Sequence, residues 1–173
     1  HQPAAFRIPV FCAAGGDGSF GDPVKRITIE STLPQLRFFL EKMKPQEEFR
    51  LTFLGGEPLL YPEGIELIAD YVNQFALENN FTTQFVVVTN GTLFNEKTIA
   101  LLNKINASIT ISLDGPAKIN DVLRPSKGGI GVTQKIEEGI SLLIANRNSI
   151  KSIGVSGVFG RKNNNLLEAY RYY

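Results

Sequence analysis

The sequence has very little cysteine and histidine. Its one cysteine, Cys12, excludes an internal disulfide and any complete four-cysteine metal site built by this chain alone. Its one histidine is the terminal His1, so serine–histidine–aspartate and cysteine–histidine catalysis have no base within the chain. Hydrolysis by a carboxylate pair such as Glu57 and Asp114 is open in principle, but no spacing favours it.

The sequence also lacks an excess of charge of either sign. Lysine and arginine total 18 against 17 acidic residues, a net charge of +1, which argues against a chain built to grip phosphate backbones or anionic membranes. Its aromatic residues do not interleave with basic ones as an RNA-binding sheet requires. No apolar run approaches the roughly 20 residues that cross a bilayer. We therefore expect neither a nucleic acid nor a membrane as a partner.

What is present is the composition of a soluble globular domain. With 173 residues, 43% of them hydrophobic, the chain can bury a substantial core, and this composition argues against disorder. No charged and then apolar leader follows His1, so we expect that processing or truncation has removed the natural start. We predict a single domain over residues 1–173.

Short runs rich in β-branched residues predict four strands, at 49–54, 83–89, 108–113 and 152–159. The middle two are almost continuously apolar, which is typical of strands buried on both faces of a parallel sheet. Apolar residues at helical spacing fall before and between the strands, in three sets: Leu36, Phe39, Leu40 and Met43; Ile65, Ile68, Val72 and Phe75; Val132, Ile136, Ile140 and Leu143.

Helix boundaries can also be read from the sequence. Pro34 and Pro62 are expected in first helical turns, where proline is tolerated. Asn95 is a good cap for a helix over 96–105, and a last helix is expected from about Asn164. Helices alternating with strands predict an α/β fold with a right-handed parallel sheet.

Neither end of this alternating array looks finished. Residues 1–21 form a glycine-rich loop without a clear element, and only residues 22–173 alternate between helices and strands. The chain ends just inside its last helix. We therefore predict the central part of a larger sheet or barrel.

Ligands of parallel α/β folds bind at the carboxyl ends of the strands. The four expected strand ends are 55–58 (GGEP), 89–91 (TNG), 112–116 (SLDGP) and 158–160 (VFG). At the first three of them, glycine stands beside polar residues. Glycine exposes backbone N–H and C=O groups to a ligand. Glu57 offers a carboxylate to a cation, and Arg124 offers a fork to a carboxylate. A zwitterionic ligand would satisfy both.

Each of these residues also has a structural alternative. Gly55, Gly56 and Pro58 could make a tight turn, and Glu57 could favour a helix dipole. Ser112 could be a buried polar residue, and Asp114 could belong to a plain turn. Arg124 could be a solvated loop charge, and Cys12 a small buried hydrophobe.

Three motifs in order, FLGGEPLL, VVTNGTL and SLDGPAKINDVLRPSKGGIG, resemble the radical SAM superfamily. The likeness is to its peptide- and protein-modifying branch, which includes anaerobic sulfatase-maturating enzymes and SPASM-type maturases. It covers about residues 5–173, nearly the whole chain. The resemblance implies that the chain is the central part of a partial (β/α)6 barrel, without its first and last strands.

The resemblance also implies a site for S-adenosylmethionine. Residues 55–58 would contact its amino group, and Ser112 and Arg124 would hold its carboxylate. Thr89 and Asn90 would line the same cavity, with Asp114 as a further hydrogen-bond partner. The cofactor-binding set is therefore Phe11, Gly55, Gly56, Glu57, Pro58, Thr89, Asn90, Ser112, Asp114 and Arg124, and Phe11 would pack near the adenine.

The cluster motif of the family is incomplete in this sequence. Family members carry three cysteines, spaced C-x-x-x-C-x-x-C, which hold a [4Fe–4S] cluster with one iron open to the cofactor. Phe11 and Cys12 match the last aromatic–cysteine pair. The first two cysteine positions fall on Ala5 and Pro9, which cannot bind iron. Cys12 is the one expected metal ligand.

Two functions follow from the resemblance. The first is reductive cleavage of S-adenosylmethionine to a 5′-deoxyadenosyl radical that takes hydrogen from a peptide or protein substrate. This activity would need a reductant such as a flavodoxin or ferredoxin and a reducing compartment, which predicts a cytoplasmic location. The second is a cluster-less scaffold or binding module that keeps the strand-end pocket without catalysis.

Overall fold

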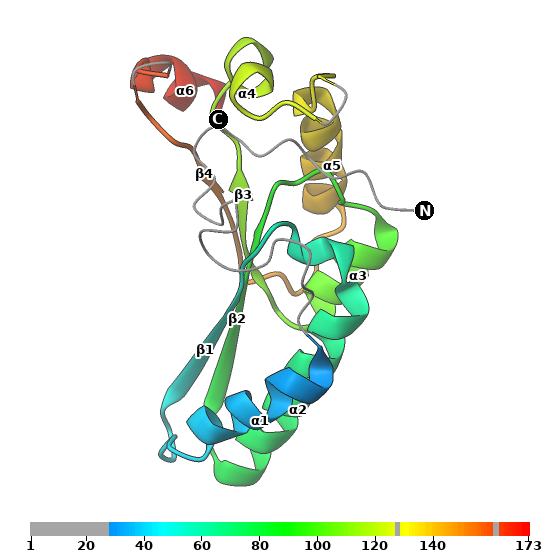
Figure 1. Cartoon of the computed structure of the whole chain (residues 1–173), viewed down its shortest axis with the longest axis vertical. Coiled ribbons are helices and arrows are strands. Elements are labelled where there is room, and N and C mark those ends of the chain that lie inside the picture. The colour runs from blue at the N-terminus through cyan, green and yellow to red at the C-terminus, as the bar shows by residue number, and fades with distance from the viewer. Residues whose placement is uncertain (1–27, 127–128, 161–162) are drawn as a thin grey trace.

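The computed structural model describes residues 28–126, 129–160 and 163–173 (Figure 1). Its elements, in chain order, are α1 (Ile29–Leu40), β1 (Glu48–Phe53), the 3-10 helix η1 (Pro58–Leu60), α2 (Pro62–Asn79), β2 (Thr82–Thr89), α3 (Glu96–Lys104), β3 (Ser108–Ser112), α4 (Ala117–Leu123), α5 (Thr133–Ala145), β4 (Ser152–Ser156) and α6 (Leu166–Tyr172). Helices alternate with strands as the sequence predicts.

The described strands form one parallel sheet in the order β1-β2-β3-β4. One row across the sheet joins Thr52 to Val86, Val86 to Ser108 and Ser108 to Ser152. Figure 1 shows α1, α2, α3 and α5 on one side of the sheet, with α4 and α6 beyond the carboxyl ends of the strands. The expected α/β fold with a parallel sheet is confirmed.

The core lies between the sheet and the helices on its covered face. Ile109 and Ile111 of β3 are fully buried there against residues such as Val72 of α2 and Leu143 of α5. Strand β2 buries Val86 and Val87, which point to opposite faces, as its continuous apolar run predicts. These central strands hold the carboxyl edge of the sheet in place.

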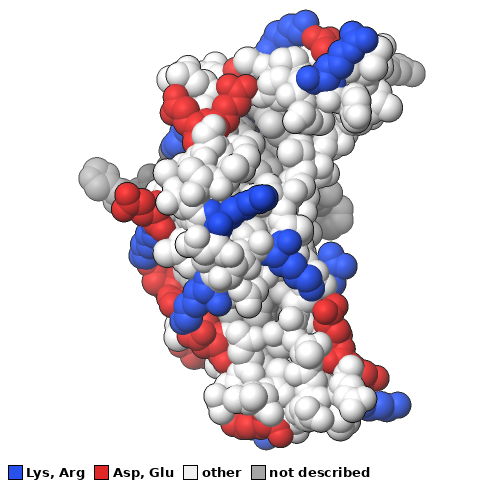
Figure 2. Space-filling model, turned by 180° about the vertical axis from the view of Figure 1, so that it is seen from behind, with Lys and Arg blue, Asp and Glu red and all other residues white. Residues whose placement is uncertain are grey.

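Charged side chains of both signs are interspersed over the surface seen from behind in Figure 2, in keeping with the net charge of +1. Three ion pairs join α2 to α3 on the outside. Lys97 contacts Glu63, and Lys104 contacts both Glu66 and Asp70 at 2.8 Å. Within the described part of the chain, no helix has the length and apolar character to cross a membrane.

Helix α1 corrects two expectations from the sequence. The Thr28 side chain caps the helix by accepting the Ser31 N–H, so the helix begins earlier and Pro34 lies in its interior, not in its first turn. Phe39, expected in the core, is 57% exposed because Leu36, Leu40 and Met43 set the buried face.

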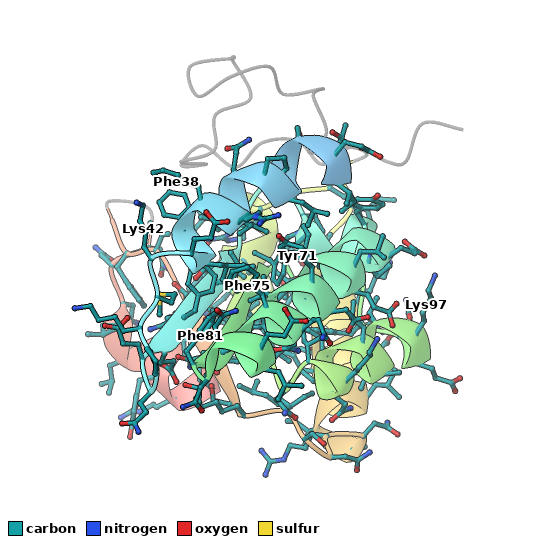
Figure 3. The ribbon with its side chains drawn as sticks, turned by 90° about the horizontal axis from the view of Figure 1, so that it is seen from below. Phe38, Lys42, Tyr71, Phe75, Phe81 and Lys97 are labelled. Atoms are coloured by element: carbon teal, nitrogen blue, oxygen red, sulfur yellow. The ribbon has the colours of Figure 1, made fainter. Side chains whose placement is uncertain are left out.

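Next to Phe39, the equally exposed Phe38 lies under the Lys42 ammonium, 4.4 Å from the ring centroid (Figure 3). A charge over an aromatic face is favourable even at an exposed position. At the same end of the molecule, Phe75 of α2 packs against Phe81 with 6.3 Å between ring centroids.

The boundaries of other elements agree better with the sequence. Pro62 is the first residue of α2, and Asn95 caps α3 by accepting the Thr98 N–H. Strand β4 ends at Ser156, three residues before the expected end. The helix α4 was not predicted, because its seven residues are too few for a clear apolar period.

Candidate functional site

Glu57 joins the ends of β1 and β2. The residue is 8% exposed, and its carboxylate accepts three hydrogen bonds. Most of its hydrogen-bonding capacity is therefore taken up within the chain. The Thr89 hydroxyl donates to Oε1 at 2.7 Å, and the Leu59 N–H donates to the same oxygen at 3.1 Å. The Asn90 N–H donates to Oε2 at 2.8 Å. Glu57 also caps η1, so it has the structural role that the sequence left open.

The charge state of Glu57 reflects two opposing effects. Burial raises the pKa of the Glu57 carboxyl, and the hydrogen bonds from Asn90, Thr89 and Leu59 oppose that rise. The carboxylate is therefore a buried acceptor whose negative charge is held by dipoles rather than by a basic side chain. Among the described residues, no cation pairs with it.

The residues at the end of β2 form a tight turn. Asn90 Oδ1 accepts the Thr92 N–H at 2.9 Å, and Thr89 Oγ1 accepts the Gly91 N–H at 3.1 Å. Gly91 has a φ of +76°, and a Cβ there would lie 3.0 Å from Ile111 and from Ile136. Glycine is required at this turn because both the backbone conformation and the packing exclude a side chain.

The backbone at Gly55 and Gly56 is open. Both residues are exposed, and a Cβ added to either would meet nothing within 4 Å. The peptide groups before Glu57 can therefore be approached closely from outside. This open backbone lies directly beside the buried Glu57 carboxylate.

Asp114 and Arg124 form a buried ion pair beyond the end of β3. Arg124 Nε donates to Asp114 Oδ2 at 2.7 Å, and Nη2 donates to Oδ1 at 3.0 Å. The side chain of Asp114 is 3% exposed, whereas that of Arg124 is 21% exposed. Arg124 is thus not a solvated loop charge, and no sequence pattern indicated that these two residues pair.

The other polar groups of Asp114 bind neighbouring segments. Its Oδ1 accepts the Val158 N–H at 2.8 Å, and its carbonyl oxygen accepts Asn163 Nδ2 at 2.8 Å. Its own N–H donates to Asn120 Oδ1 at 3.0 Å. Asp114 therefore ties the loop after β4 to α4 and to Arg124.

Asn120 extends this network to helix α5. It is 0% exposed, and its Nδ2 donates to Thr133 Oγ1 at 2.9 Å. The Thr133 hydroxyl donates in turn to Asp121 Oδ1 at 2.6 Å. These residues were not predicted from the sequence. Asn120 and Asp121 lie close to the SLDGP motif, which was the one available signal, and Thr133 had none.

Asp121 caps helix α5 from helix α4. Its Oδ1 accepts the N–H groups of Val132 and Thr133 at 2.8 and 2.9 Å. Partial burial opposes ionisation, but the hydrogen bonds from Thr133 and Val132 outweigh it and lower the pKa of the Asp121 carboxyl. The cap is therefore charged across the neutral pH range.

We expect Asp121→Ala to lower the free energy of unfolding by about 1–2 kcal/mol at pH 7, the usual loss for a helix cap. Because the folded-state pKa lies below the ordinary 3.8, this contribution is present above that pH and disappears as the pH falls through the lowered pKa. Urea unfolding at neutral and acidic pH would measure both. Glu138→Ala, on the exposed face of α5, is the matched control, and an equal loss at every pH would contradict the cap.

The other expected site residues lie at the same edge. Ser112 ends β3 and is half-buried, and Thr89 pairs with Ile111, so the residues that follow on β2 and β3 are neighbours. Pro58 begins η1. Phe11 and Cys12 lie outside the described residues. Within the described ranges, no cluster of three histidine, cysteine, aspartate or glutamate side chains could hold a metal.

The site thus combines a buried carboxylate and an open glycine backbone after β1 with a partly exposed arginine side chain after β3. These features define a parallel α/β protein whose polar site lies at the carboxyl edge of its sheet, the place where such folds bind ligands. The radical SAM superfamily matches residues 10–172, and the chain belongs to that superfamily.

The chain is also similar to curated proteins. An uncharacterized protein of Methanocaldococcus jannaschii is 35% identical over 126 residues, which are 73% of this chain and 42% of that protein. The radical SAM cyclopropyl synthase TigE of Paramaledivibacter caminithermalis is 26% identical over 151 residues, which are 85% of this chain and 31% of that protein.

Solved structures show the same fold. Native anSMEcpe, an anaerobic sulfatase-maturing enzyme, with bound AdoMet and the Kp18Cys peptide superposes with a TM-score of 0.78 at 20% identity, over 98% of this chain and 46% of that enzyme. The same enzyme with bound AdoMet alone gives a TM-score of 0.74 over 98% and 44%. The resemblance predicted from the sequence is confirmed, and the chain spans less than half the length of each of these proteins.

Proposed function

We propose that this chain is the S-adenosylmethionine-binding part of a radical SAM-type protein that acts on a peptide or protein. The observation that carries the proposal is the presence of a carboxylate and a guanidinium, not paired with each other, at one sheet edge. Glu57 is an acceptor beside open backbone, and the side chain of Arg124 is 21% exposed. The amino-acid portion of S-adenosylmethionine carries the complementary ammonium and carboxylate.

The described residues fit this cofactor. Open space at Gly55 and Gly56 leaves room for a group to approach the peptide backbone. Because Glu57 already accepts three hydrogen bonds, the ammonium would be held by backbone carbonyl groups of the exposed Gly55 and Gly56, with the buried Glu57 carboxylate adding a favourable field. Arg124 would take the carboxylate, and Ser112 and Asn90 lie at the neighbouring strand ends.

The residues of this chain do not fit a [4Fe–4S] cluster. The family chemistry, reductive cleavage of S-adenosylmethionine and hydrogen abstraction, depends on such a cluster. Holding it takes three thiolates, whereas the sequence has one cysteine. We therefore derive no catalytic step for this chain. A reductant such as a flavodoxin or ferredoxin, and a reducing compartment such as the cytoplasm, belong to the same proposal only if iron is bound.

The peptide substrate is supported by likeness alone. The solved structure that holds a peptide is that of anSMEcpe, and the cyclopropyl synthase is a further radical SAM protein. The second candidate function is a cluster-less module that binds a small zwitterion or peptide at the same edge. The single cysteine favours it.

Iron counting after anaerobic reconstitution with iron and sulfide, combined with calorimetry of S-adenosylmethionine binding, tests these functions. We expect measurable binding of the cofactor and far less than the about four irons per chain of a complete cluster. About four irons per chain, with an EPR signal that changes on adding the cofactor, would show that other ligands complete the cluster. This result would overturn the hypothesis of a cluster-less module. No binding of the cofactor with or without iron would overturn the proposed site.

A further inference from the structure

The Arg124 guanidinium has two edges that can bind a carboxylate, and only one is occupied. An arginine carries five N–H groups in a rigid plane. Asp114 takes the edge formed by Nε and Nη2, at 2.7 and 3.0 Å. The remaining edge, formed by Nη1 and the outer N–H of Nη2, contacts no acceptor among the described residues. The side chain that carries this edge is 21% exposed.

Asp114 itself is unable to serve as a direct ligand contact. Its side chain is 3% exposed, and both oxygens already accept hydrogen bonds from Arg124 and Val158. Its backbone N–H and carbonyl are held by Asn120 and Asn163. Two residues therefore hold the carboxylate and two hold the backbone of Asp114, and the carboxylate fixes the plane of the guanidinium in turn.

We propose that Asp114 is a positioning residue, which holds one edge of the Arg124 guanidinium so that the other edge receives the carboxylate of S-adenosylmethionine. The inference rests on the proposed function, because it assigns the cofactor to this edge. It differs from the expectation that Asp114 contacts the cofactor. Asn120, which orients the Asp114 backbone, belongs to the same support.

Removing the charge of Asp114 has opposite expected effects on cofactor affinity, depending on whether charge or orientation matters, so one measurement can distinguish the two. The Asp114 carboxylate offsets the positive charge of Arg124, so it weakens the attraction of Arg124 for a second carboxylate. If charge alone mattered, removing the negative charge would strengthen cofactor binding. If orientation matters, the freed guanidinium loses its preset fork and binding weakens.

Asp114→Asn is the first test, made on the whole protein by calorimetry. The amide keeps the size of the side chain, but its NH2 group must face an N–H of Arg124 or of Val158. We expect affinity for S-adenosylmethionine to fall about ten-fold or more, the loss typical of a charge-assisted hydrogen-bond pair. Affinity for 5′-methylthioadenosine, which lacks the carboxylate, should change less than about two-fold.

Two further variants complete the design. Asp70→Asn removes an exposed carboxylate paired with Lys104 on the outer surface and should leave binding of both compounds unchanged. Arg124→Lys keeps the positive charge but loses the planar fork, so it should also weaken S-adenosylmethionine binding. The double variant Asp114→Asn with Arg124→Lys should bind no more weakly than Arg124→Lys alone, because the two residues act as a unit.

The outcomes separate this inference from the proposed function. Equal or tighter S-adenosylmethionine binding by Asp114→Asn, with a wild-type protein that binds, would overturn the positioning role and leave the cofactor site standing. If Asp114→Asn does not fold, Arg124→Lys provides the test instead. Wild-type affinity of Arg124→Lys for S-adenosylmethionine would overturn the positioning role, because a positive charge without the planar guanidinium would then suffice. A wild-type protein that binds neither compound would overturn the proposed function itself.

Discussion

Replacing Glu57 with alanine is expected to lower the free energy of unfolding by about 3–5 kcal/mol, since it leaves buried donors without an acceptor at about 1–3 kcal/mol each. The Thr89 hydroxyl and the Asn90 N–H would lose their partner in the segment after β1, and the Leu59 N–H would lose its cap. The change removes the side-chain link between the segments that follow β1 and β2, so any cofactor binding at this edge should fall with it. Urea unfolding measures the first effect.

Two variants calibrate this result. Glu57→Gln keeps the shape but places an NH2 group against one of the three donors, so we expect a smaller loss than for alanine. Glu63→Ala removes an exposed carboxylate that pairs with Lys97 and should cost at most about 1 kcal/mol. If Glu57→Ala were no more harmful than Glu63→Ala, the hydrogen bonds of Glu57 would not be what joins the two strand ends.

Asn120→Asp should be comparably damaging at neutral pH, although it changes almost no volume. The amide Nδ2 donates to Thr133 Oγ1, whose only proton goes to Asp121. A carboxylate in that place would face an oxygen without a proton, at a position with 0% exposure. An uncompensated buried charge costs about 3–5 kcal/mol.

The loss caused by Asn120→Asp should shrink at acidic pH. Burial raises the pKa of the new carboxyl, so the folded state binds its proton more readily than the unfolded state. The difference from wild type therefore falls as the pH is lowered, because the protonated group can again donate to Thr133. Asn73→Asp, an exposed position that accepts the Thr83 hydroxyl through Oδ1, is the control with the same chemical change. A loss that is the same at every pH would contradict this account.

Regular local patterns allowed most of the fold to be predicted from the sequence. The apolar run at 83–89 gave β2 within one residue, and Asn95 gave the start of α3, because strand burial and helix capping depend on neighbouring residues. The prediction that Phe39 is buried was wrong, because two phenylalanines stand side by side and only the packing decides which face of α1 is buried. The prediction that Pro34 lies in a first helical turn was wrong, because the cap three residues upstream of Ser31 was not recognised.

The place of the candidate site could be predicted from the sequence, but the hydrogen bonds within it could not all be predicted. The carboxyl ends of parallel strands meet at one edge, so Glu57 was expected near Thr89 and Asn90, and the structure places all three in one hydrogen-bonded group. The hydrogen-bond partners of Asp114 were not predictable. They come from α4, the loop after β4 and Arg124, and such contacts leave no periodic trace in a sequence.

The order of the strands has a consequence for how the protein is made. Each described strand after β1 pairs with the strand just before it in the chain, so β2 can dock on β1, β3 on β2 and β4 on β3 without waiting for a later segment. A chain emerges from the ribosome from its N-terminus at about 5–20 residues per second. The sheet can therefore grow strand by strand during translation, with its newest edge always the one that the next helix–strand unit will cover.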